Sequence, residues 1–394
     1  MYKIKTLNNI SDACKDLIRD HGYVIGDDVE NPDIIFVRAT NILEYDFNPE
    51  LCCIARAGIG VNTIPLTRCA EKGIVVFNTP GGNANAVKEL FLFGLGMACR
   101  ELHDAMEWVN TFDTSSGNIA VTMEKVKNRF VGPEYMGKKI GVVGMGNVGR
   151  IVANICTHLG MDVYGYDPFL SVDAAWMISN RVTRVSSLNE LCGCDFITLH
   201  APLTELTENM VNEELLSKMK DGVRIINYAR QEIVNEEAMV AALESGKVAR
   251  YVTDFPTNTL IGRKNVVMTP HLGGTTYEAE ENCAIMAARQ SIDYMENGNI
   301  VNSVNFGQAV MAPSLHARLC VFHKNIPSVI AQITSAVSAR GLNIENMVNA
   351  SMKGFPTAYT MLELSQNPDS ALINAVKAVS PVIRVRAIPS KTIQ

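Results

Sequence analysis

The sequence predicts an α/β protein with two doubly wound, Rossmann-like domains and a small C-terminal domain of the ferredoxin-like βαββαβ order. Three observations predict it. Short apolar runs that end in polar or glycine-rich residues alternate with helical segments over most of the chain. A glycine-rich loop follows one of these runs near the middle of the chain. The segment 316–394 breaks the alternation and has an order of its own.

The first alternating segment predicts a parallel sheet. Strands are expected at 34–37, 52–55 and 75–77, each followed by a polar or glycine-rich loop. Such loops collect at one edge of the sheet, where ligands bind. A long helix is expected over 85–109, and the less periodic stretch 110–137 is interpreted as a connection between domains.

The second alternating segment is clearer than the first and predicts another parallel sheet. Its strands are expected at 140–143, 163–166, 196–199, 224–227, 251–253 and 266–268, and a helix is expected over 277–297. The C-terminal βαββαβ order is expected from a strand at 318–322, a helix at 327–340, strands at 344–351 and 356–364, a helix at 371–379 and a strand at 382–388.

Composition excludes several classes of protein. The chain has 394 residues, of which 47% are hydrophobic and 19% charged, which is typical of a globular protein with two or three cores. Its net charge is −6 and no basic block stands out, so we expect no nucleic-acid or membrane partner. The N-terminal ten residues lack the apolar core of a secretory signal.

Ten cysteines are scattered among apolar residues, which indicates reduced thiols and a cytoplasmic protein. The pairs Cys52-Cys53 and Cys192-x-Cys194 have no second pair at ligand spacing, so we expect no metal site.

The strongest motif is a dinucleotide-binding loop. Gly144, Gly146 and Gly149 fit G-x-G-x-x-G between a predicted strand and a helix that starts near Asn147. The glycines would allow a tight turn, close approach of a pyrophosphate, and packing of helix on strand. Asp167 ends the next strand, where a carboxylate binds the adenosine ribose and repels a 2′-phosphate. The motif therefore favours NAD over NADP as the cofactor.

Two further residues follow predicted strands. Arg230 comes just after the strand at 224–227, where a guanidinium can bind a carboxylate through two parallel hydrogen bonds. His271 follows a strand and a proline and precedes two glycines. Imidazole is the usual proton donor and acceptor at a carbonyl or hydroxyl because it titrates near neutrality. Taken alone, Arg230 would be interpreted as a surface arginine.

Together these residues resemble the D-2-hydroxyacid dehydrogenase family over nearly the whole chain. Several motifs in the family order carry the resemblance, and they are Arg56–Asn62, Asn78–Val87, the glycine loop, Tyr166–Phe169, Leu199–Thr204, Asn227–Asn235 and Thr269–Thr276. The family fold implies a substrate domain at 1–88 and 277–310 and an NAD-binding domain at 89–276.

The resemblance also implies roles for single residues. Arg230 would hold the substrate carboxylate and keto oxygen, with His271 as the acid/base. The implied cofactor contacts are Gly144, Gly146, Asn147, Val148, Gly149, Asp167, Thr207, Ala229, Asp254 and Val87. The implied substrate contacts are Arg56, Ala57, Gly58, Asn83, Arg230 and His271.

One departure from the family pattern concerns the catalytic histidine. The family usually places a glutamate a few residues after the equivalent of Asp254, bonded to that histidine, and this chain has none between Glu244 and Glu278. Such a partner orients an imidazole and favours its charged form. Either Asp254 serves as that catalytic partner, or water and backbone do, or the histidine works without a charged partner.

The segment 316–394 resembles an ACT domain, a module that often binds amino acids. His323, Asn325 and Asn343 match the pattern that binds a regulatory L-serine in ACT-bearing members of the family. Ser328 stands where that pattern has glycine, and its side chain would crowd the ligand. An ACT domain used only for assembly is the alternative. We expect a homodimer or a homotetramer.

The resemblance implies NAD-dependent oxidation of 3-phospho-D-glycerate to 3-phosphohydroxypyruvate, the first step of L-serine biosynthesis. Another D-2-hydroxyacid substrate is one alternative, because the fold and the two site residues do not fix the substrate. The other alternative is a non-catalytic nucleotide- or amino-acid-sensing protein.

Overall fold

The computed structural model describes residues 1–390, so the last four residues of the predicted domain 316–394 lie outside the described residues. The chain divides into two compact units. The terminal unit consists of Met1–Gly82 with Glu280–Gln394, and the central unit of Asn83–Ala279. The segment predicted to be a separate C-terminal domain is grouped with the N-terminal segment.

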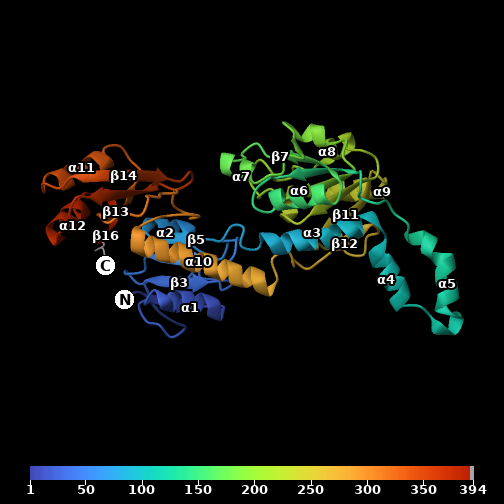
Figure 1. The fold of residues 1–394 in the computed structure, drawn as a ribbon, viewed down its shortest axis with the longest axis horizontal. Helices are drawn as coiled ribbons and strands as arrows, with labels where there is room; N and C mark the ends of the chain where they lie inside the picture. Colours follow the sequence, from blue (N-terminus) through green and yellow to red (C-terminus); the bar gives the residue numbers. More distant parts are fainter. Residues whose placement is uncertain (391–394) are drawn as a thin grey trace. The chain divides into compact units, whose positions relative to one another are not determined.

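The terminal unit contains a five-stranded parallel sheet in the order β2-β1-β3-β4-β5 (Figure 1). Its strands are β1 (Lys3–Thr6), β2 (Val24–Gly26), β3 (Ile34–Val37), β4 (Cys53–Arg56) and β5 (Val75–Phe77). Its helices are α1 (Asp12–Asp20), α2 (Leu66–Glu71) and most of α10 (Tyr277–Asn297). All four residues of β3 are buried, which explains its continuous apolar run. Strands β1 and β2 are not predicted from the sequence, because β1 alternates lysine with apolar and polar residues and β2 has only three residues, the last of them a glycine.

The central unit contains a seven-stranded parallel sheet in the order β12-β11-β10-β9-β6-β7-β8. Its strands are β6 (Lys139–Val143), β7 (Asp162–Tyr166), β8 (Val182–Arg184), β9 (Phe196–Leu199), β10 (Val223–Asn227), β11 (Val248–Thr253) and β12 (Val266–Met268). Its main helices are α3 (Ala84–Cys99), α6 (Gly149–His158), α7 (Val172–Trp176), α8 (Glu213–Lys218) and α9 (Glu236–Glu244). The strand order reverses between β6 and β9, and ligands bind at such switch points.

Two expectations about 85–137 are wrong. The single long helix is two helices, α3 and α4 (Leu102–Asn110), because Arg100 between them has extended backbone. The stretch 110–137 belongs to the central unit rather than connecting domains. It carries η1 (Thr114–Ser116), α5 (Ile119–Val126) and η2 (Lys127–Phe130). Figure 1 shows α5 beside α4.

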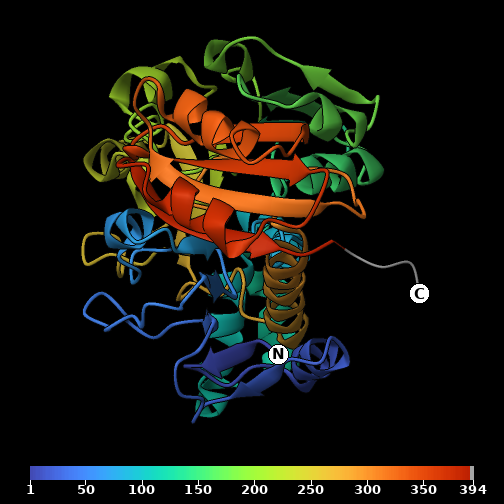
Figure 2. The same ribbon diagram turned by 90° about the vertical axis from the view of Figure 1, so that its left-hand side faces the viewer.

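A four-stranded antiparallel sheet, ordered β14-β15-β13-β16, forms the C-terminal part of the terminal unit. Its elements are β13 (Ala317–Lys324), α11 (Val329–Ser338), β14 (Ile344–Ser351), β15 (Thr357–Leu364), α12 (Ser370–Lys377) and β16 (Val382–Ile388). Figure 2 shows both helices on one side of this sheet. They pack against Leu319, Val321 and Leu362. The elements therefore follow the predicted βαββαβ order.

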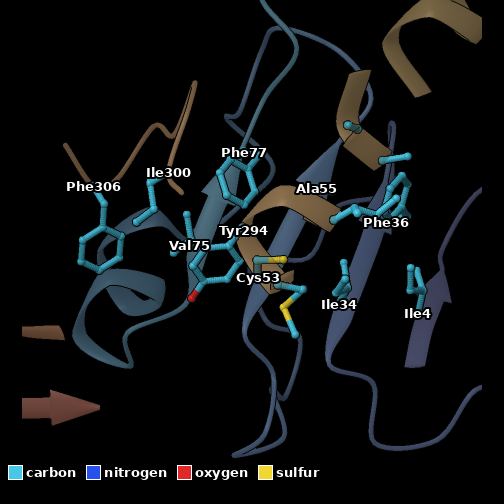
Figure 3. Packing of buried hydrophobic residues seen from close by; sticks show 14 of the residues in the cluster. Ile4, Ile34, Phe36, Cys53, Ala55, Val75, Phe77, Tyr294, Ile300 and Phe306 are labelled. Atoms are coloured by element: carbon cyan, nitrogen blue, oxygen red, sulfur yellow. The ribbon is translucent and has the colours of Figure 1, made fainter. Parts of the chain in front are cut away.

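The opposite face of this small sheet is also buried. Phe322, Tyr359 and Met361 share one apolar core with Tyr294 and other residues of α10 and of the parallel sheet. Figure 3 shows Tyr294 among the sheet residues of this core, near Val75 and Phe77. The ring centroids of Tyr294 and Phe77 are 5.7 Å apart. The antiparallel sheet is therefore built into the core of the terminal unit.

Side chains of the antiparallel sheet also cap the carboxyl end of α10. A helix leaves its last carbonyls without partners inside the helix, and cations are favourable there. Arg386 donates to the carbonyls of Tyr294 (2.5 Å) and Met295 (3.1 Å). Arg318 donates to the carbonyl of Asn297 (2.7 Å), and the Tyr359 hydroxyl to that of Gly298 (2.7 Å).

Within the described residues, no helix is long and apolar enough to span a bilayer. All ten cysteines are free thiols.

The Arg386 contacts generate a prediction about stability. Arg386→Met should lower the free energy of unfolding by about 2–3 kcal/mol, because it removes charge-assisted bonds to buried carbonyls. Arg340→Met is the matched control, since Arg340 is an exposed residue at the end of α11 and loses the same charge. Urea unfolding followed by circular dichroism measures both variants. Equal midpoints for the two would show that the cap contributes nothing.

Candidate active site

The glycine loop lies between β6 and α6 at the switch point of the central sheet. Gly144 has a φ of +86°, and a Cβ there would lie 2.6 Å from the Ala201 nitrogen. A Cβ on Gly149 would lie 1.8 Å from the Gly144 carbonyl oxygen, so only glycine fits. A Cβ on Gly146 would meet no atom within 4 Å. The loop is therefore tight at its two ends and open in its middle, which fits a pyrophosphate at the start of α6.

Asp167 follows β7 and faces this loop. Its carboxylate accepts hydrogen bonds from the backbone nitrogens of Met145 and Phe169, both at 2.9 Å. These bonds fix the carboxylate beside the loop, in the position where a cofactor ribose binds. The residues present therefore fit a dinucleotide.

Two cavities of about 390 and 310 Å³ adjoin Asp167. Gly146, Asn147 and Arg150 line one of them, and Trp176 and Arg184 line the other. Trp176 and Arg184 could not be found from the sequence, because neither belongs to a motif. Both lie in the region between β7 and β8, and β8 was not predicted.

A half-buried histidine, His200, lies beside the glycine loop. The His200 ring donates to or accepts from the Thr198 hydroxyl at 2.9 Å. Burial lowers the pKa of His200 to about 3, so the ring is neutral at physiological pH. A Cβ on Gly149 would lie 3.4 Å from the His200 Cβ. His200 therefore packs against the start of α6.

Arg230 lies in a turn that Asn227 holds in place. Asn227 ends β10 and is fully buried. Its amide donates to the Arg230 carbonyl (2.8 Å), and its side-chain oxygen accepts from the Ala229 nitrogen (3.1 Å). The end of β10 therefore fixes the backbone position of Arg230.

Asp254 follows β11 and organises the loop after β12 that carries His271. This loop, residues 269–274, is called the histidine loop. Asp254 is 2% exposed, and its carboxylate accepts hydrogen bonds from the Thr269 hydroxyl and from the Leu272 and Gly273 nitrogens, the latter two at 2.7 Å. Its carbonyl accepts from the His271 nitrogen (3.0 Å). His271 adopts a left-handed φ of +57°, which a non-glycine residue keeps only under such constraint. Asp254 therefore bonds the backbone of the loop.

The His271 imidazole itself is exposed and packs against one ring. The centroid of Phe255 lies 5.1 Å from that of the imidazole, at an angle of 63°. Within the described part of the central unit, no carboxylate lies within 4 Å of the imidazole. Asp254 was one alternative to the missing glutamate. Its carboxylate bonds the Thr269 hydroxyl and the backbone nitrogens of Leu272 and Gly273, and not the imidazole.

The start of α3 packs against the same loop. A Cβ on Gly273 would lie 3.5 Å from Val87, and one on Gly274 would lie 2.6 Å from the Asn83 amide nitrogen. The two glycines therefore let the histidine loop approach α3. Asn83, Val87, Asp254 and His271 come together in the central unit.

Thr207 and Ala229 lie in the segments that follow the neighbouring strands β9 and β10. Ala229 is buried after β10. The Thr207 hydroxyl donates to the Pro202 carbonyl (2.6 Å) and accepts from the Thr204 nitrogen (2.8 Å), closing the turn after β9.

Arg56, Ala57 and Gly58 form a loop of the terminal unit, after β4. The Gly58 nitrogen donates to the Thr79 hydroxyl (2.8 Å), and the Thr79 nitrogen donates to the Gly58 carbonyl (3.1 Å). Thr79 is fully buried, so these bonds tie the loop to the segment after β5.

The residues predicted to bind a regulatory ligand have partners within the chain. His323 is buried, and its two ring nitrogens bond the Lys324 carbonyl and the Thr360 hydroxyl, both at 2.8 Å. The Asn343 amide donates to Glu345 (3.0 Å). The Asn325 nitrogen donates to the Pro356 carbonyl (2.9 Å). Ser328 has a left-handed φ of +70°, the conformation that glycine adopts most easily.

No group of three or more histidine, cysteine, aspartate or glutamate side chains suited to a metal ion occurs among residues 1–390.

Comparison with known proteins identifies the class and then the family. Residues 94–273 match the family model described as the D-isomer specific 2-hydroxyacid dehydrogenase, NAD binding domain. The central unit is thus an NAD-binding domain.

Two relatives and one solved structure extend the comparison. A D-3-phosphoglycerate dehydrogenase of Haemophilus influenzae is 30% identical over 355 residues, which cover 86% of this chain and 82% of the relative. One of Synechocystis is 36% identical over 279 residues, 68% of this chain and 48% of the relative. The chain therefore spans about half the length of that relative.

The solved structure is an NAD⁺-bound 3-phosphoglycerate dehydrogenase of Entamoeba histolytica. It is 27% identical, with a TM-score of 0.57, and the match covers 77% of this chain and 98% of that chain. The chain belongs to the D-isomer specific 2-hydroxyacid dehydrogenase family.

Proposed function

We propose that the protein oxidises 3-phospho-D-glycerate to 3-phosphohydroxypyruvate with NAD, the first step of L-serine biosynthesis. One observation carries the proposal. Arg230, Asp254 and His271 follow the adjacent parallel strands β10, β11 and β12, so all three start from one edge of the sheet that also presents the glycine loop. The relatives named D-3-phosphoglycerate dehydrogenase support this substrate.

The residues of the chain would divide the chemistry between them. A bound NAD would supply the hydride acceptor for C2 of the substrate. His271 accepts the proton of the C2 hydroxyl through its imidazole. Arg230 binds the carboxylate with its planar fork and stabilises the charge that develops on the C2 oxygen. Asp254 holds the loop in which His271 has a left-handed φ.

Other residues would hold the two ligands. Asp167, with Asn147 and Val148 at the start of α6, would bind the adenosine half of the cofactor. Val87, Thr207 and Ala229 would complete its pocket. Arg56, Ala57, Gly58 and Asn83 would bind the substrate, with the Arg56 guanidinium on the phosphate.

We propose that the antiparallel βαββαβ part is an ACT domain and that L-serine is its effector. Its strand order is that of the ferredoxin-like fold, and His323, Asn325 and Asn343 match the serine-binding pattern. We further propose a cytoplasmic location, which the ten free thiols support, and assembly as a homodimer or homotetramer.

The role given to Asp167 predicts a change in cofactor choice. Asp167→Ala should shift the ratio of kcat/KM values toward NADP by at least about tenfold, because the 2′-phosphate no longer meets a repelling charge. Asp162→Ala, at the exposed start of the same strand, is the matched control. Steady-state kinetics with both cofactors measures the ratio, and an unchanged preference would refute the assignment.

The proposed reaction is tested by NADH formation from 3-phospho-D-glycerate, with D-lactate as the competing substrate. His271→Ala should lower kcat by roughly 10²–10⁴-fold, the usual range for a positioned acid/base. Arg230→Lys should also lower kcat/KM severely, since an ammonium group lacks the bidentate fork. Activity with D-lactate alone would point to another hydroxyacid substrate, and no activity with either would favour the non-catalytic alternative.

The left-handed backbone of Ser328 leads to a prediction about the affinity of the proposed regulatory site for L-serine. Ser328→Gly should bind L-serine at least about tenfold more tightly than the wild type, because glycine adopts this φ freely and removes the crowding side chain. Ser338→Gly, at the exposed end of α11, is the control for loss of a serine side chain. Calorimetry with L-serine measures the affinities. No heat from either Ser328→Gly or the wild type would leave the domain an assembly module.

A further inference from the structure

Hydrogen bonds fix the backbone of the histidine loop, but these bonds do not involve the imidazole of His271. The His271 nitrogen donates to the carbonyls of Asp254 and Thr269, both at 3.0 Å, and the carboxylate of Asp254 holds the next two residues. Among the described residues, the one ring contact of the His271 imidazole is with Phe255, and no hydrogen bond reaches the imidazole. An exposed ring on a fixed backbone can still occupy several rotamers. Proton transfer needs one of them, with the ring nitrogen within hydrogen-bond reach of the substrate hydroxyl.

Phe255 is the aromatic side chain that the imidazole contacts. It follows Asp254 directly, and its backbone nitrogen donates to the Thr253 hydroxyl at 3.2 Å, which ties its backbone to the end of β11. Its ring is half-buried, and the two rings meet edge to face at 5.1 Å and 63°. This is the preferred geometry for a pair of aromatic rings.

We propose that Phe255 is the positioning residue of His271, selecting the productive rotamer of the imidazole by ring packing where a carboxylate partner is absent. The proposal rests on the proposed function, since it assigns the imidazole a proton to accept. A neutral ring restricts rotation but adds no charge. A carboxylate partner would both orient the imidazole and stabilise its positive charge. In this chain Phe255 would supply the orientation alone.

The contact can be measured without any activity. Histidine labelled with ¹³C gives imidazole resonances for His271, assigned by their loss in His271→Ala. Phe255→Leu should move these resonances, because the ring current of Phe255 is removed. Phe93→Leu is the control, since Phe93 is an exposed phenylalanine on the outer side of α3. Resonances that stay in place in Phe255→Leu would show that the rings do not meet and would overturn the proposal.

The same variants should separate kcat from KM. Phe255→Leu should lower kcat by about three- to tenfold with little change in the KM for NAD, because an edge-to-face contact is worth about that factor in rotamer population. Phe255→Tyr should restore most of the rate, because it keeps the ring. An equal loss in Leu and Tyr variants, or a loss confined to KM, would contradict a positioning role.

A second pair of variants tests which way the side chain at 255 faces. Phe255→Glu would place a carboxylate beside the imidazole, and it should move the acid limb of the kcat/KM profile upward by about one pH unit relative to Phe255→Gln. The charged groups on the neighbouring strand ends are Asp254 and Arg230, and both are the same in the two variants. Coinciding acid limbs would place the 255 side chain away from the imidazole.

The two proposals fail in different ways. If the wild type forms no NADH from any D-2-hydroxyacid while Phe255→Leu still moves the His271 resonances, the proposed function fails and the ring contact stands. If the wild type is active and Phe255→Leu changes neither the resonances nor kcat, the positioning role fails and the proposed function stands.

Discussion

The carboxylate of Asp254 is the group on which the candidate site depends. It is buried at the end of β11, and all three of its hydrogen bonds go to the loop between Thr269 and Gly273. A buried charge persists only when its surroundings satisfy it, so loop and carboxylate stabilise each other. This mutual dependence keeps His271 in a left-handed conformation and brings the two glycines against α3. The candidate acid/base is therefore held by the backbone, which leaves its side chain to be oriented by packing.

Helix α10 begins directly after this loop and ends under the antiparallel sheet. The division between the two units falls at Ala279 and Glu280, within its first turn. Its last carbonyls are bonded by Arg318, Arg386 and Tyr359, so the far end of the helix belongs to the same core as the C-terminal segment. In this chain the C-terminal segment therefore completes the terminal unit.

Much of this organisation could be predicted from local sequence. The glycine loop, Asp167, Arg230 and His271 follow apolar strands whose ends the pattern marks, and parallel strands bring such ends to one edge. The helix at 277–297 was predicted with its observed bounds because its apolar and polar residues keep a helical period over its whole length. The resemblance to the dehydrogenase family was sound because several motifs occur in one order, and the family comparison confirms it.

The remaining features depend on contacts between distant residues. The break at Arg100 interrupts no apolar period, so the two helices around it look like one. Strands β1 and β8 are short and polar, and only their neighbours in the sheet make them strands. No motif shows that Phe255 lies against His271, because that contact joins the ends of β11 and β12. The left-handed conformation of Ser328 agrees with the glycine that the serine-binding pattern has at that position.

We propose that His271 and Arg230 act together on one oxygen atom of the substrate. The most direct test is a crystal structure of the protein with NADH and 3-phospho-D-glycerate, in which the distances from the C2 hydroxyl oxygen to both side chains are measured. Both distances should fall within hydrogen-bond range, at about 2.6–3.2 Å, with the imidazole packed on Phe255. A C2 hydroxyl bound away from His271, or an Arg230 guanidinium turned away from the substrate carboxylate, would contradict it.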